Sequence, residues 1–163
     1  MKPLSADSAE QAEFHRWIGA IVEAYAWFDF NLGLKLNAWP GSNASDVLDA
    51  AKPLKVRLDR LIHLVGRSTA SVSPEQTARW EEWLEVVNSA RALRNDYAHG
   101  RWIKEGDIGL GGVKWRLVPL QWSAGLQEPV EPITLTCGQL EAQRNQISWA
   151  MNRMHEAVAP FQG

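Results

Sequence analysis

The segment Arg94-Asn95-Asp96-Tyr97-Ala98-His99-Gly100 gathers side chains that can act together on a phosphate group. The guanidinium of Arg94 is permanently charged and offers N–H donors that match phosphate oxygens. His99 adds an imidazole, the side-chain type that can accept or donate a proton near neutral pH. With Asn95 to orient them, these groups are sufficient for attack of a ribose 2′-hydroxyl on its own phosphodiester without a metal ion.

A structural role is the alternative interpretation of the same residues. Arg94 would then cap carbonyl groups at a helix end, and His99 would make one structural hydrogen bond. Groups with perturbed pKa values concentrate at functional sites but also occur in structural networks. The combination of arginine, amide and imidazole within two helical turns favours the functional interpretation.

The spacing within the segment limits how these groups can meet. Asn95 and His99 are four residues apart and share one face of a helix, whereas Arg94 and His99 are separated by about 140° around the axis. Arg94 and His99 can meet only if the helix ends near His99 or if two copies of the segment face each other. Gly100 predicts a helix end at this point, and a homodimer would satisfy the second condition.

Composition restricts the class of protein. A chain of 163 residues with a formal net charge of -2 suits one domain, residues 1–163, without a broadly basic surface. Between residues 91 and 116, however, six basic residues stand against three acidic ones. We expect any RNA contact to come from this local patch. Its candidate substrate-binding residues are Arg91, Arg101, Trp102 and Lys104.

Cysteine, histidine and hydropathy patterns bound the remaining possibilities. The single Cys137 excludes an internal disulfide and fits a reducing compartment. Its place near a predicted helix start could lower its pKa, but a small buried residue is the expected role. The four histidines form no ligand cluster, so we expect no metal and no cofactor. A signal pattern and a long apolar run are missing, which predicts a cytoplasmic protein with no membrane partner.

Apolar spacing predicts a long first helix. Asp7 and Ser8 each begin a capping box, and a stripe with helical spacing follows at Phe14, Trp17, Ile18, Ile21, Val22, Tyr25, Phe28, Leu32 and Leu36. Trp27, Phe30 and Leu34 lie off this stripe. A helix that is apolar on a second face favours a second neighbour, such as a partner subunit.

The next segments predict a broken second helix and a third one. Residues 39–43 mark a break, and Asn43 or Ser45 can open a short helix through Ala51. A helix is predicted over 54–65, closed by Gly66 and buried through Leu54, Leu58, Leu61, Ile62 and Val65. Ser73-Pro74-Glu75-Gln76 predicts the start of the third helix, whose core stripe is Trp83, Val86, Ala90, Leu93 and Tyr97.

After Gly100 the pattern changes to alternation. Residues 101–104 and 113–118 flank a glycine-rich turn and predict a β-hairpin over about 101–122. Trp102, Trp115 and Trp122 could stack single-stranded bases, although fixing the hairpin to the helices is the more ordinary role of such residues. Thr136-x-x-Gln139 begins the last helix, which ends at Ala159-Pro160 and buries Leu140, Ile147, Met151, Met154 and Val158.

These elements predict an all-α fold, a four-helix up-down bundle with the β-hairpin inserted before the last helix. Arg94 and Asn95 followed by His99, at the end of the third long helix, resemble the R-x4-6-H motif of the HEPN superfamily. The string Arg-Asn-Asp-Tyr-Ala-His-Gly is similar to the form found in many small bacterial and phage members. The motif covers seven to nine residues, while helix number and motif position agree over most of the chain.

The resemblance implies a dimeric helical domain, often a metal-independent endoribonuclease of toxin-antitoxin, phage-defence or RNA-processing systems. By this resemblance, Arg94 stabilises the phosphorane charge, His99 transfers the proton and Asn95 positions them at the dimer interface. The products would carry a 2′,3′-cyclic phosphate and a 5′-hydroxyl. Members modified by a nucleotidyltransferase antitoxin often have tyrosine two residues past the histidine, where this chain has Arg101.

Two functions from different classes therefore remain open. One is an RNase with RNA as substrate and an antitoxin or regulatory protein as partner. The other is a non-catalytic HEPN-like module that binds RNA, a nucleotide or a protein. The acidic total charge favours the second, and the joint presence of Arg94, Asn95 and His99 favours the first. A metal-dependent hydrolase is a distant third.

Overall fold

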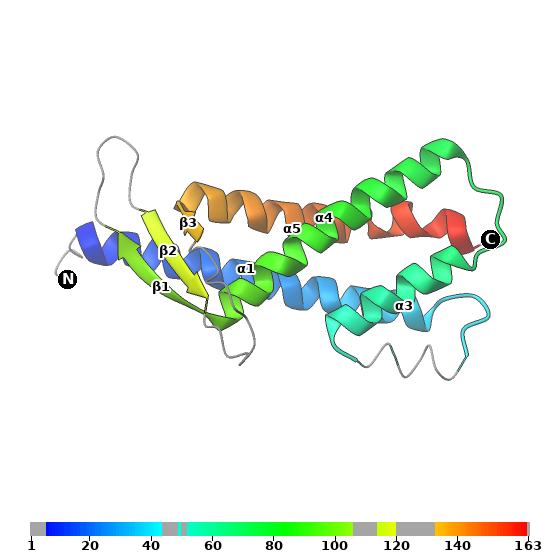
Figure 1. The fold of residues 1–163 in the computed structure, drawn as a ribbon, viewed down its shortest axis with the longest axis horizontal. Helices are drawn as coiled ribbons and strands as arrows, with labels where there is room; N and C mark the ends of the chain where they lie inside the picture. The colour runs from blue at the N-terminus through cyan, green and yellow to red at the C-terminus, as the bar shows by residue number, and fades with distance from the viewer. Residues whose placement is uncertain (1–5, 44–48, 50–51, 106–113, 120–132, 163) are drawn as a thin grey trace, which may run out of the picture. The chain divides into compact units, whose positions relative to one another are not determined.

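The computed structural model describes residues 6–43, 49, 52–105, 114–119 and 133–162. In these residues the chain is mostly helical, with a small antiparallel sheet (Figure 1). The helices are α1 (Ala6–Asn37), α3 (Leu54–Gly66), α4 (Pro74–His99) and α5 (Cys137–Val158), followed by the 3₁₀ helix η2 (Ala159–Gln162). The strands are β1 (Gly100–Glu105), β2 (Lys114–Pro119) and β3 (Ile133–Leu135).

The chain divides into two compact units. Unit 1 comprises residues 1–23 and 89–146, and unit 2 comprises residues 24–88 and 147–163. Helices α1, α4 and α5 contribute residues to both. The expectation of one domain over 1–163 stays a prediction.

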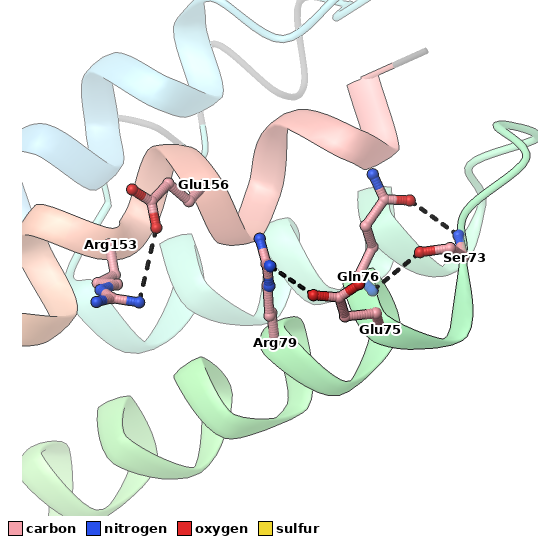
Figure 2. A network of polar contacts seen from close by, with 6 residues as sticks. All are labelled: Ser73, Glu75, Gln76, Arg79, Arg153 and Glu156. Carbon is pink, nitrogen blue, oxygen red and sulfur yellow. Dashed lines mark hydrogen bonds and ion pairs between the residues drawn. The ribbon is translucent and has the colours of Figure 1, made fainter.

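Local sequence signals set the helix starts as expected. At the start of α4, the Gln76 backbone N–H donates to Ser73 Oγ over 3.2 Å, and the Ser73 N–H donates to Gln76 Oε1 over 2.8 Å (Figure 2). Thr136 and Gln139 make the same reciprocal pair before α5, with distances of 2.8 and 3.2 Å. Each pair satisfies two backbone donors that a helix start would otherwise leave open. The capping boxes predicted at Ser73 and Thr136 are confirmed.

Helix α1 begins before the residues predicted to cap it. Its first helical residue is Ala6, so Asp7 and Ser8 lie within its first turn. It ends at Asn37, where the predicted break follows and Gly41 adopts a φ of 69°. The left-handed conformation at that turn suits glycine. The short helix expected from Asn43 or Ser45 to Ala51 falls largely outside the described residues.

Unit 2 has an aromatic and aliphatic core. Trp83 is fully buried, stacks on Trp80 at 5.3 Å between ring centroids, and lies 6.1 Å from the Phe28 ring. Its indole N–H donates to the carbonyl of Ala150 on α5 over 2.7 Å. The other buried side chains of this unit include Tyr25, Leu32, Leu36, Leu58, Leu61, Val65, Val87, Ile147, Met154 and Val158.

Two side chains expected in the core are exposed. Val22 is 59% exposed and Ile62 is 37% exposed, because each lies about 100° around its helix from a buried neighbour, Ile21 or Leu61. On α4, Val87 is buried instead of Val86, since the phase is set by Trp80 and Trp83. The predicted core positions Leu93 and Tyr97 have side chains outside the described part of the chain.

Helix α3 is joined to α1 by a largely sheltered ion pair. Arg57 Nη1 lies 3.1 Å from Asp29 Oδ1, and the same nitrogen donates to the Asp29 backbone carbonyl over 2.5 Å. The Arg57 side chain is 16% exposed and the Asp29 side chain 34%. By contrast, the Arg79–Glu75 pair on α4, at 2.6 Å, is 57% and 76% exposed (Figure 2). Asp29 therefore has a structural partner in unit 2.

Arg57→Ala is expected to lower the free energy of unfolding by about 1–3 kcal/mol, because it removes two charge-assisted contacts and leaves Asp29 half-buried without its cation. Arg79→Ala, which removes an exposed pair, should cost less than about 0.5 kcal/mol. Urea unfolding followed by circular dichroism measures both. Equal losses for the two variants would contradict a structural role for the Arg57–Asp29 contact.

Candidate functional site

Helix α4 runs without a break through the whole candidate motif and ends at His99. The next residue, Gly100, is already the first residue of β1, so no loop separates the helix from the sheet. The helix end predicted from Gly100 is confirmed. The side chains of residues 92–101, and so those of Arg94, Asn95, His99 and Arg101, lie outside the described part of the structure.

The backbone of α4 nevertheless limits the motif's geometry. Because the helix is continuous, positions 94 and 99 are about 140° apart around the axis and roughly 7.5 Å apart along it. Positions 95 and 99 share a face. Position 94 follows the buried Ala90 by one turn, whereas position 99 lies on the opposite side of the helix from Ala90. Helix geometry alone therefore does not bring Arg94 and His99 of one chain together.

The sheet beside the motif is built from an antiparallel hairpin and a third strand, in the order β1-β2-β3. Trp102 pairs with Leu117 and Lys104 with Trp115, while Trp115 also pairs with Leu135. The predicted hairpin is confirmed in its two strands, although its turn and Trp122 lie outside the described residues. The sequence analysis does not predict β3, a three-residue strand in a proline-containing return.

The sheet lies beside the first part of α1 (Figure 1). An aromatic cluster fixes one face of the sheet to that helix. The ring of Phe14 stacks on Trp115, with 3.9 Å between centroids and 17° between planes. Trp102 meets the same Phe14 ring edge-on at 5.0 Å. Phe14 and Trp115 are 3% and 5% exposed. Trp115 therefore packs into the core of unit 1, the more ordinary role considered for these tryptophans.

Lys104 lies on the same face and has an acidic partner. Its Nζ is 2.9 Å from Glu10 Oε2 on α1, with the two side chains 28% and 45% exposed. Cross-strand neighbours project from the same side of a sheet, which explains why Lys104 accompanies Trp115 toward α1. The contacts of Trp102 and Lys104 serve the packing of the sheet, and their predicted role in substrate binding stays a prediction. Arg91 is partly exposed on α4.

The opposite face of the sheet carries a basic residue that the sequence analysis did not select. Arg116 pairs with Ile103 on β1 and with Thr134 on β3. Arg116 is partly exposed, and both of its neighbours are exposed. Strand alternation assigns position 101 to this face, together with Ile103. The alternation of the strands, counted from Trp102, could have shown that Lys104 lies on one face of the sheet and that Arg101 and Arg116 lie on the other.

Cys137 is the first residue of α5 and is partly exposed, not buried as expected. Burial raises the pKa of its thiol, and Glu13 and Glu10 add to this effect, while Arg16 opposes it. A helix N-terminus ordinarily lowers a thiol pKa, but here desolvation and the acidic side chains on α1 prevail. Among the described residues, no group of three or more histidine, cysteine, aspartate or glutamate side chains could hold a metal ion.

Comparison with protein-family models, curated proteins and solved structures found no match to this chain. Within the described part of the chain, none of the helices is both long enough and apolar enough to cross a membrane.

The electrostatic surroundings of Cys137 predict opposite effects of two charge-neutralising variants. Glu13→Gln should lower the thiol pKa, because the neighbouring negative charge disfavours the thiolate, and Arg16→Gln should raise it. Alkylation by iodoacetamide measured against pH reports the thiolate fraction, so the reactivity midpoint should move down in pH for the first variant and up for the second. Shifts in the same direction for both variants would contradict the electrostatic account.

Proposed function

We propose that this protein is a HEPN-like, metal-independent endoribonuclease that works as a homodimer. In this proposal α1, α3, α4 and α5 form the helical bundle, with the sheet inserted before its last helix. Two supports come from the residues themselves: the Arg94, Asn95 and His99 set, and the end of α4 at His99. The observation that carries the proposal is the end of α4 at His99, because the HEPN motif is expected at the end of a helix.

The chemistry assigned to the motif is an internal transesterification. His99 takes the proton of a ribose 2′-hydroxyl, whose oxygen attacks the adjacent phosphorus. Arg94 neutralises the charge that develops on the phosphorane oxygens. The bond from phosphorus to the 5′-oxygen breaks and the leaving oxygen receives a proton, which gives a 2′,3′-cyclic phosphate and a 5′-hydroxyl. Asn95, one helical turn before His99, positions the imidazole.

The continuity of α4 supports a dimeric site. With positions 94 and 99 about 140° apart on one helix, a second copy related by a twofold axis is the simplest way to bring an arginine and a histidine to one phosphate. The exposed apolar stripe on α1 is consistent with self-association: Trp27, Phe30 and Leu34 are 54%, 54% and 50% exposed. Exposed apolar surface of this kind marks interaction sites.

The proposal also places RNA contacts on the outer face of the sheet. Strand alternation puts position 101 and the partly exposed Arg116 on the face of the sheet opposite Trp102 and Lys104, and we assign both residues to phosphates. These two residues join Arg91 as the basic contacts of the substrate. An antitoxin or regulatory protein is the partner that the resemblance implies for such an enzyme.

The direct test is cleavage of mixed RNA by the purified protein in EDTA. Wild-type protein should cleave, while Arg94→Ala and His99→Ala should each lose at least about a hundredfold in rate, the scale of a missing acid–base or charge-stabilising group. His63→Ala and Arg79→Ala are matched controls, because both side chains are exposed elsewhere on α3 and α4. Expression of the wild-type chain, but not of His99→Ala, should also be toxic to a bacterial host.

The second candidate is a binding module that does not cleave RNA, which the acidic net charge of -2 favours. It predicts a harmless protein that binds RNA equally well with His99 or alanine at that position. Under both candidates Arg116→Ala should weaken RNA binding more than Lys104→Ala does. Absence of cleavage together with retained RNA binding would reject the enzyme and leave the binding module.

A further inference from the structure

A cavity in unit 2, distinct from the RNase motif, has the composition of an anion site. It has a volume of about 500 Å³ and is bounded by the turn after α1, the end of α3 and η2. Ligand pockets in proteins fall within about 300–1,000 Å³. Its lining includes Trp39, Arg60, Arg67, Ser68, Thr69 and Phe161. This set is called the Arg60–Arg67 pocket below.

Hydrogen bonds fix the walls of the pocket. The Arg67 N–H donates to the carbonyl of His63 over 3.1 Å, and the Ser68 N–H donates to that of Val65 over 3.1 Å, which closes α3. The Ser68 hydroxyl donates to the Phe161 carbonyl over 2.7 Å and accepts the Ala70 N–H over 3.2 Å. These bonds hold the C-terminal residues beside the end of α3 (Figure 1).

The turn after α1 forms the remaining wall. The Ser42 N–H donates to the Trp39 carbonyl over 3.0 Å, and Gly41 takes its left-handed conformation between them. Trp39 is only 8% exposed, so its ring is held firmly by the protein. The pocket thus combines a rigid aromatic wall with the polar end of a helix.

The charges at this pocket favour an anion. Arg60 and Arg67 both line it, and no carboxylate is among its described lining residues. The Arg60 side chain is 16% exposed, and its Nε lies 3.8 Å from Asp49 Oδ2, which is longer than a hydrogen bond. Arg67 is exposed, and no carboxylate among the described residues pairs with it. Arg67 therefore brings to the pocket a positive charge that no described carboxylate pairs with.

The helix dipole works against this positive charge without outweighing it. The pocket lies at the C-terminal end of α3, where a helix carries about half a negative charge. The carbonyl groups of His63 and Val65 at this helix end already accept hydrogen bonds from the N–H groups of Arg67 and Ser68. The full positive charge of Arg67, carried on forked donors, outweighs the residual dipole for a ligand such as phosphate, which guanidinium groups bind in bidentate fashion.

We propose that the Arg60–Arg67 pocket binds a small molecule that carries a phosphate group next to a planar apolar ring. Arg67 receives the phosphate, with Arg60 beside it in the pocket wall, and Thr69 supplies a hydroxyl donor at the same wall. Trp39 and Phe161 contact the ring. The proposal is independent of RNA cleavage, because none of these residues belongs to the motif on α4 or to the sheet.

The test is isothermal titration of the full chain with phenyl phosphate, and with inorganic phosphate and phenol as separate arms. Phenyl phosphate should bind saturably and more tightly than either fragment. Arg67→Ala should weaken its binding by about tenfold, the scale of one charge-assisted hydrogen bond, and Arg67→Lys should recover part of the loss. Because Arg67 is exposed, both variants are expected to keep the wild-type circular dichroism spectrum.

Arg153→Ala is the matched control, since it removes the same charge from an exposed pair with Glu156 in the same unit (Figure 2). It should leave the affinity within about twofold of wild type. Absence of saturable phenyl phosphate binding, or an equal loss in Arg153→Ala, would overturn the proposal. Equal affinity for phosphate and phenyl phosphate would overturn the role of Trp39 and Phe161. Binding unchanged in His99→Ala would separate this pocket from the proposed RNase site, and lost binding in that variant would contradict their independence.

Discussion

The stack of Phe14 on Trp115 is the interaction on which the proposed site depends. Helix α4 passes directly into β1, so the position of the sheet fixes the direction in which the chain leaves His99. The sheet in turn is fixed to α1 by the Phe14 ring, which contacts Trp115 on β2 and Trp102 on β1. The Lys104–Glu10 pair adds a polar contact at the same face. The end of α4 is thereby continuous with a strand of a fixed sheet, which suits residues that must keep a defined geometry.

The same packing divides the basic residues into two groups. Lys104 has an acidic partner on α1, whereas Arg116 belongs to the other face of the sheet. In unit 2, Arg57 is used to join α3 to α1, and Arg67 lies at the wall of a cavity. We expect phosphates at Arg67 and Arg116, whereas Arg57 and Lys104 serve to link elements of the fold.

Sequence reasoning predicted the elements whose signals are local. Two helix starts could be predicted from capping pairs, Ser73 with Gln76 and Thr136 with Gln139. The partners in each pair are three residues apart, so the signal needs no distant part of the chain. Sequence reasoning failed where tertiary packing decides. Val86 and Val87 are equivalent as sequence, and only the packing of Trp80 and Trp83 selects Val87 for the core. Strand β3 contains the strand-forming residues Ile133 and Thr134, but three residues are too short a pattern to predict, and the strand is identified by its pairing with β2.

The candidate site also has features that the sequence predicts and features that depend on tertiary packing. Its residue types, its place at a helix end and the following hairpin could be read from the sequence. The partner of Lys104 could not, because Glu10 is 94 residues away along the chain. The Arg60–Arg67 pocket could not be predicted from the sequence either. It is formed by a turn, a helix end and the C-terminal residues, none of which carries a motif.

The central claim is that one subunit supplies Arg94 and the other supplies His99 to a shared phosphate. It is tested by coexpressing Arg94→Ala and His99→Ala chains with different tags and measuring the RNase activity of the doubly purified mixed dimer. Such a dimer keeps one complete pair, so the account predicts about half of the wild-type activity from two inactive parents. A mixed dimer as inactive as its parents would contradict the account.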